Sequence, residues 1–245
     1  MLEPLYTRHA LAIALMLGAV SPTFAQTTTA PDATLYTTYS VATDLETASW
    51  VVCGSTAESE GCFGSGTLGP FGHIGAMLEG QPAVNGSTVT REIYVLDTAS
   101  GTAANGVTLY VYTKTDVVSS SDDQASTTLT QTVPLPLLAG GSTVTAYVAA
   151  NSVNLYVGTN QSTSAVSIVK DQWTTRSVGG FSPPLTVGGI TANAYGYVTV
   201  TFGAVGGEFS GFYVFGPTGA PEEDGGGAQF SLNNINAVVP AALPF

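Results

Sequence analysis

Carboxylate side chains are the groups in this chain best suited to catalysis. Two carboxylates hydrolyse a glycosidic bond when they lie about 5–10 Å apart and one of them has a raised pKa. Five acids lie on or beside the predicted strands: Glu79, Glu92, Asp97, Asp116 and Asp171. We take Glu79 and Asp97 as candidate catalytic residues, although an acid in such a position is more often simply solvated.

Histidine chemistry depends on one residue, because His73 is the only histidine that follows the N-terminal segment discussed below. His73 lies in the glycine-rich segment 72–75, where a structural hydrogen bond is the commoner use of a histidine. The chain has no G-x-S-x-G sequence, so nothing indicates a serine hydrolase. A zinc site built from histidine and cysteine is excluded by the same shortage of ligands.

The densest mixture of aromatic, acidic and constrained residues surrounds Cys53 and Cys62, which enclose eight residues. In an oxidising compartment we expect these cysteines to form a disulfide that pins one hairpin tip. Sugars stack on aromatic rings beside a few polar groups. We therefore take as the candidate binding surface Trp50, Glu58, Glu60 and Phe63. Phe71, Trp173 and Phe181 are further rings near predicted loops, and core packing explains any of these rings equally well.

A cluster of three acids near the C-terminus is a weak candidate for calcium binding. Glu222, Glu223 and Asp224 precede the glycine run 225–227. Flexible loops rich in oxygen atoms suit calcium, which takes about six to eight oxygen ligands. The spacing matches no EF-hand loop, and a solvated acidic turn is the alternative. We expect no cofactor.

The N-terminus has the features of a signal peptide. Arg8 and His9 precede the apolar run 10–20, and small residues at 23 and 25 indicate cleavage before Gln26. The run is shorter than the roughly 20 residues of a membrane span. We predict a signal peptide at 1–25, a Thr-rich lead at 26–33 and a single all-β domain at 34–245. The mature protein would be secreted or periplasmic, with no membrane span.

The acidic charge balance excludes one class of partner. The chain has a net charge of −12, and removing residues 1–25 takes away one acid and one base, which leaves this value unchanged. The remaining bases are scattered singly: Arg91, Lys114, Lys170 and Arg176. Nucleic acid binding requires clustered cations, so we exclude it.

Four short stretches share an aliphatic or aromatic residue followed by Tyr and Val: 93–95, 109–111, 155–157 and 212–214. Polar and apolar residues alternate with a period of two in 87–95 and 195–201, and Asn85-Gly86 is a strong tight-turn signal. Helical periodicity is nearly absent after the predicted signal. The sequence therefore predicts an all-β protein built from similar hairpins.

An internal repeat suggests how the hairpins are arranged. Residues 149–157 align with 191–199 at an offset of 42 residues, and glycine-rich segments at 72–75, 138–141 and 187–189 precede similar strands. With these motifs the chain resembles small secreted bacterial β-propeller-like proteins of uncharacterised function. The resemblance implies a four- or five-bladed β-propeller-like array of antiparallel hairpins, with Glu79 on an inner strand at the central mouth. The implied blades lie near residues 72–116, 135–170 and 186–219, with a further partial blade at 35–66. The closing segment 228–240 would pair with an N-terminal strand.

Two other architectures suit the same strands. A two-sheet β-sandwich would have the same strand count and similar turns. An outer-membrane barrel would explain the terminal Phe245, but Pro240 and Pro244 cannot donate the hydrogen bonds of a final strand.

The sequence favours a non-enzymatic exported binding or surface-interaction protein. Its partner would be an extracellular polysaccharide or another protein. A carbohydrate-active hydrolase with a carboxylate pair is the first alternative, and a structural component of the envelope is the second.

Overall fold

The computed structural model describes residues 23–30, 33–56, 60–118, 123–181, 183, 185–203, 209–216 and 228–231. These residues form seventeen strands and no helix, which confirms the prediction of an all-β protein. No membrane-spanning helix occurs in this part of the chain. Most of the predicted signal peptide lies outside the described residues.

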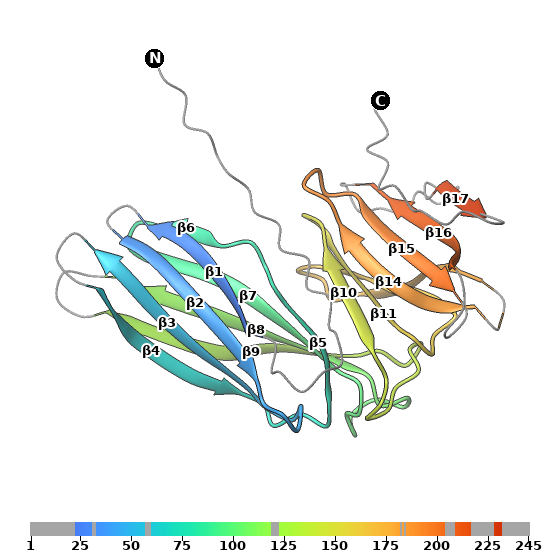
Figure 1. The fold of residues 1–245 in the computed structure, drawn as a ribbon, viewed down its shortest axis with the longest axis horizontal. Coiled ribbons are helices and arrows are strands. Elements are labelled where there is room, and N and C mark those ends of the chain that lie inside the picture. Colours follow the sequence, from blue (N-terminus) through green and yellow to red (C-terminus); the bar gives the residue numbers. More distant parts are fainter. Residues whose placement is uncertain are drawn as a thin grey trace, which may run out of the picture.

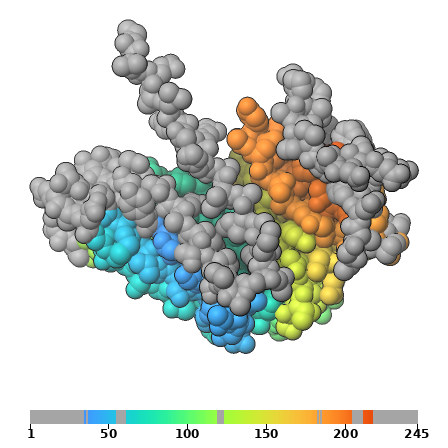
Figure 2. Space-filling model, in the orientation of Figure 1, coloured from blue at the N-terminus to red at the C-terminus, as the bar shows by residue number. Residues whose placement is uncertain are grey.

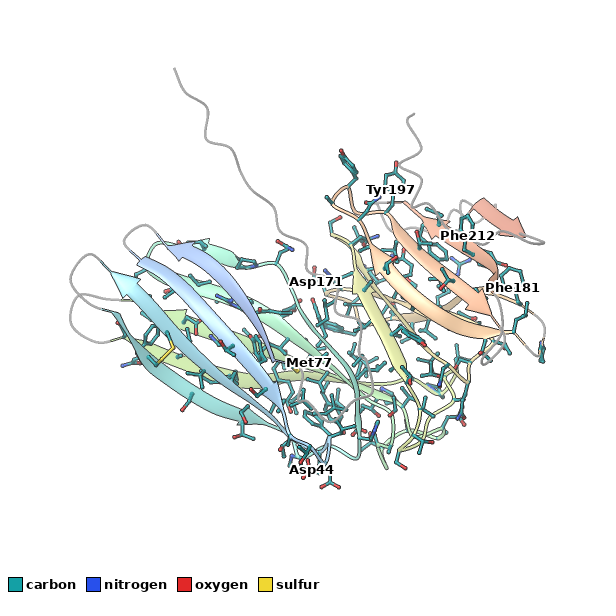
Figure 3. All side chains as sticks on the ribbon, viewed as in Figure 1. Asp44, Met77, Asp171, Phe181, Tyr197 and Phe212 are labelled. Atoms are coloured by element: carbon teal, nitrogen blue, oxygen red, sulfur yellow. A yellow bond between two sulfur atoms is a disulfide. The ribbon has the colours of Figure 1, made fainter. Side chains whose placement is uncertain are left out.

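Sheet A is an antiparallel meander of the first strands of the chain. It contains, in spatial order, β1 (Thr23–Ala30), β2 (Ala33–Val41), β3 (Ala48–Thr56) and β4 (Glu60–Leu68). β1 pairs with β2 along its whole length, so the predicted cleavage point between Ala25 and Gln26 lies inside a paired strand. Cys53 and Cys62 lie opposite each other in β3 and β4 and form the predicted disulfide, seen as a yellow bond in Figure 3.

Sheet B contains the longest strands. Its order is β5 (Ile74–Glu79), β7 (Thr88–Asp97), β8 (Thr108–Val117) and β9 (Gln124–Pro134), and the short β6 (Ala83–Asn85) also pairs with β7. The predicted tight turn at Asn85-Gly86 joins β6 to β7, and Gly86 has a φ of 59°. Glycine suits this turn because it has no Cβ to clash at positive φ.

Sheets C and D repeat the four-stranded meander. Sheet C contains β10 (Ala146–Ala150), β11 (Asn154–Thr159), β12 (Ser164–Val169) and β13 (Thr175–Gly180). Sheet D contains β14 (Thr186–Ala192), β15 (Val198–Gly203), β16 (Phe209–Phe215) and β17 (Ala228–Ser231). The predicted glycine-rich segment 187–189 lies inside β14, at an irregularity in its pairing with β15, rather than ahead of the strand.

The predicted offset of 42 residues corresponds to equivalent turns in sheets C and D. Asn151 and Asn193 each follow the first strand of their sheet. The Oδ1 atom of Asn151 accepts hydrogen bonds from the backbone N–H groups of Val153 and Asn154, and that of Asn193 accepts them from Tyr195 and Tyr197. The same residue type therefore closes the same turn in both sheets.

Three apolar clusters join the sheets in chain order, with A and B on one side of Figure 1 and C and D on the other. Successive residues of a strand face opposite sides of its sheet. Ile93 therefore packs against sheet A while Tyr94 packs against sheet C. Sheet C likewise shares a cluster with sheet D, which includes Tyr156 and Val200. Figure 2 shows parts of sheet A and of sheets C and D as neighbouring blue-to-cyan and yellow-to-orange areas of one face.

None of the four sheets closes on itself. Sheets B and D begin close to the implied blade starts, at residues 74 and 186. Sheets A and C do not, because they begin at residues 23 and 146 instead of near 35 and 135. β17, the described part of the segment 228–240, pairs with β16 of its own sheet rather than with an N-terminal strand. Face-to-face packing of neighbouring sheets is common to sandwiches and propellers.

Candidate functional site

A cluster of charged side chains is buried between sheets A and B. Glu79 ends β5, Arg91 lies in β7, and Lys114 and Asp116 lie in β8. Nη1 of Arg91 lies 3.0 Å from Oε1 of Glu79, and its Nη2 lies 3.4 Å from Oδ2 of Asp116. Lys114 donates a hydrogen bond to Asp116, and the hydroxyl of Tyr39 donates one to Glu79 over 2.7 Å. The charged side chains of this cluster are at most 1% exposed.

Burial dominates the electrostatics of this cluster. Loss of water raises the pKa of Glu79, against the opposing effect of Arg91, and lowers the pKa of Lys114, against the attraction of Asp116. Oε2 of Glu79 and Nε of Arg91 lack hydrogen-bond partners among the described residues. Since two cations face two carboxylates away from solvent, the cluster holds the core of sheets A and B and offers no access to a polymer.

The raised pKa of Glu79 makes stability depend on pH. The native protein binds the proton of this carboxyl more tightly than the unfolded chain does, so the stability that this group contributes falls as the pH rises above its ordinary value of 4.5. Glu79→Gln cannot lose that proton. We expect the unfolding free energy of the wild type, minus that of Glu79→Gln, to decline between pH 4.5 and neutral pH in urea titrations. A difference in unfolding free energy that does not change with pH would contradict the raised pKa of Glu79.

Asp97 organises a loop rather than forming a pair with Glu79. Its carboxylate accepts hydrogen bonds from the backbone N–H groups of Gly72, His73 and Ala99 over 2.8–2.9 Å, and the side chain is buried. Glu79 pairs with Ile93, whereas Asp97 pairs with Ile74 at the other end of β5. The strand rise separates the two acids by about 13 Å, beyond the distance of a glycosidase pair.

His73 has the structural hydrogen bond that the sequence favours. Its Nδ1 atom lies 2.8 Å from the hydroxyl oxygen of Thr98. The ring is half-buried, beside the loop that Asp97 holds.

The structure places Trp50 in the core rather than on a binding surface. Its side chain is 2% exposed, and Nζ of Lys114 lies 5.0 Å from the centre of its ring. Phe63 is half-buried and packs against the cluster of Leu35 and Val89. The Trp50 ring, buried between sheets A and B, cannot stack on a surface ligand. Of the acids predicted beside them, Glu58 and the side chain of Glu60 lie outside the described residues, as do Glu222, Glu223 and Asp224.

A second group of polar and aromatic residues lies where sheets B and C meet. Nζ of Lys170, which follows β12, lies 5.9 Å from the centre of the Tyr94 ring and donates a hydrogen bond to the carbonyl of Asn151 over 2.7 Å. The Tyr94 hydroxyl donates a hydrogen bond to Glu92. Trp173 packs against the apolar cluster of sheets B and C and is half-buried. Asp171, labelled between the sheets in Figure 3, is exposed.

The turn between β12 and β13 has an unusual backbone. Asp171 has a φ of 67° and Trp173 a φ of 57°. A large side chain rarely adopts this left-handed conformation, and such conformations concentrate at functional sites. A hydrogen bond from the backbone N–H of Trp173 to the carbonyl of Val169, over 2.8 Å, holds the turn. The aromatic side chain is thus presented from a closed turn.

Charged residues of this turn and of sheet B interact with each other. Burial lowers the pKa of Lys170, while the nearby carboxylates of Glu92 and Asp171 oppose that shift. Burial, with the hydrogen bond to Glu92, raises the pKa of the Tyr94 phenol. We call this group, Glu92, Tyr94, Lys170, Asp171 and Trp173, the junction site. It combines two aromatic residues with two carboxylates and an ammonium group.

The sequence singled out three residues of the junction site separately, as acids (Glu92, Asp171) or as a ring near a loop (Trp173). Their proximity depends on the packing of sheet C on sheet B. The one local signal was the polar segment 170–173 ending in tryptophan.

No protein family model matches the chain, and no curated protein matches its sequence.

Proposed function

We propose that the chain is an exported, non-enzymatic protein that binds an extracellular polysaccharide at the junction site. The observation that carries the proposal is Trp173, a half-buried residue held in a left-handed turn and packed against the apolar cluster of Tyr94. Lys170, in the same turn, is influenced by the carboxylates of Glu92 and Asp171. A ring in a closed turn loses little conformational freedom when a sugar stacks on it. Export is supported by the signal-like N-terminus and by the disulfide.

We also propose that the four sheets are the blades of an open propeller-like array. Two observations support it. Each sheet is a meander in chain order. β10 contacts both β5 and β14, so the first strands of three successive sheets are neighbours, as the inner strands of blades are.

Trp173→Ala tests the proposed binding. Because a sugar–aromatic contact loses most of its area when the ring is removed, we expect retention in affinity electrophoresis on neutral polysaccharides to fall about tenfold or more. The panel comprises mixed-linkage β-glucan, xyloglucan and galactomannan. Tyr195→Ala is the matched control, because Tyr195 is 76% exposed on a different hairpin.

If Trp173→Ala and Tyr195→Ala lose retention equally, the binding site does not lie at Trp173. A wild-type protein that no polysaccharide in the panel retains would reject the proposal and favour a protein partner or a structural role. Thermal unfolding of each variant shows whether a loss of retention reflects a loss of fold.

A glycoside hydrolase at the same site is a second candidate function. It is favoured by the two carboxylates, Glu92 and Asp171, that act on the same lysine. Release of reducing ends by the wild type, abolished in Glu92→Gln and in Asp171→Asn, would establish it in place of simple binding.

A further inference from the structure

Sheet C covers only part of the face of sheet B. β7 and β8 have ten residues each, whereas the strands of sheet C have five or six. The covered end contains Tyr94, Leu96, Leu109 and Val111, which pack in the shared apolar cluster. Beyond Tyr94 the same face continues past the edge of sheet C.

The continuing face carries hydroxyl groups in register. The alternation of side chains places Lys114 and Asp116 towards sheet A, so Thr113 and Thr115 lie on the opposite face. Two rows run across the strands: Glu92–Thr113–Thr128 and Thr90–Thr115–Ser126. Every one of these six side chains is half-buried or exposed. We call them the hydroxyl face.

The geometry of a sheet makes this face regular. Neighbouring strands lie about 4.8 Å apart, and residues two apart along a strand lie about 6.7 Å apart. Each threonine or serine hydroxyl can donate one hydrogen bond and accept others. Glu92 is the only charged member, and it also belongs to the junction site.

The chemistry of the hydroxyl face selects one kind of partner. A protein interface would need an apolar centre, whereas these six residues are all polar. Polyanions are disfavoured by the net charge of −12 and by the absence of a cation among the six. A chain of neutral sugars matches the face, because it offers uncharged hydroxyl groups at repeated intervals.

We infer that the hydroxyl face is an extended subsite for a neutral polysaccharide. A chain bound at Trp173 continues along the row Glu92–Thr113–Thr128, across β7, β8 and β9. This inference rests on the proposed function, since it extends the junction site. It adds that affinity increases with chain length, because longer ligands reach Thr113 and Thr128.

The double variant Thr113→Val, Thr128→Val removes two hydroxyls while keeping side-chain shape and strand preference. In affinity electrophoresis and calorimetry of the full chain, we expect about tenfold weaker binding of mixed-linkage β-glucan and of its hexasaccharide. Binding of the trisaccharide, which reaches only the junction site, should not change. Thr38→Val, Thr67→Val is the control on the outer face of sheet A, where both side chains point away from sheet B.

The outcomes separate the two proposals. If Trp173→Ala abolishes binding while the Thr113, Thr128 variant binds the polymer as the wild type does, the hydroxyl face is rejected and the junction site stands. If the control variant loses as much affinity as the test variant, the assignment to this face is also rejected. If the wild type retains no neutral glycan, both proposals fail.

Discussion

Replacing Arg91 with methionine should lower the free energy of unfolding by about 3–5 kcal/mol, because breaking a buried ion pair leaves charge uncompensated in the core. The guanidinium contacts the carboxylates of both Glu79 and Asp116, and all three side chains are at most 1% exposed. Lys114 alone cannot neutralise two buried carboxylates. Urea denaturation of the wild type and the variant at neutral pH measures the difference.

Arg176→Met is the control for this experiment. Arg176 is exposed in β13, and a surface substitution of this kind changes stability by about 0.5 kcal/mol or less. Equal midpoints for Arg91→Met and the wild type would show that the charged cluster does not support the packing of sheets A and B. A loss of stability between these two results would indicate that Glu79 binds a proton in Arg91→Met, because its protonation would relieve part of the uncompensated charge.

Trp50→Ala should cost about 3–5 kcal/mol of unfolding free energy, as removal of a buried aromatic side chain does. The ring is 2% exposed in the cluster between sheets A and B, and it covers the Lys114 ammonium. A Cβ on Gly66 would lie 2.7 Å from the ring, so this glycine leaves room for it. Denaturant titration of Trp50→Ala against Val51→Ala measures the effect, because Val51 is the neighbouring residue with 39% exposure.

The Trp50 variant also separates two sites. We expect polysaccharide retention per folded molecule to be unchanged in Trp50→Ala, because the ring lies in the core and not at the junction site. A stable Trp50→Ala protein that has lost retention would return the binding surface to the disulfide hairpin. If Trp50→Ala is less stable but still folded at the assay temperature, a loss of retention would likewise place the binding surface at the disulfide hairpin.

The buried charges of sheets A and B show why composition was a poor guide to the surface. Four bases follow residue 25, and two of them, Arg91 and Lys114, are fully buried with acids as partners. The scattered spacing of these cations disfavoured a cationic surface patch. It did not reveal that two of them lie inside the molecule, since a lysine between two threonines is normally expected to face water.

Local features were predicted well. The alternation at 87–95, the turn at Asn85-Gly86 and the repeat at 149–157 and 191–199 correspond to β7, its hairpin and two equivalent turns. Each depends on residues a few positions apart, so the sequence pattern contains the necessary information. The disulfide belongs to this group, because Cys53 and Cys62 lie in adjacent strands of one hairpin.

The candidate site depended on contacts that no local pattern contains. Trp50 and Trp173 are both aromatic residues near predicted strand ends, yet one lies in the core and the other at the junction site. Glu79 and Asp97 lie at opposite ends of a strand pair, whereas Glu92 and Asp171, far apart in the chain, act on one lysine. By itself, therefore, the sequence determined the strands, turns and disulfide, because strand alternation and turn geometry are short-range properties. Only the tertiary structure decided which charges are buried and which acids and rings meet, because those depend on how one sheet packs on the next.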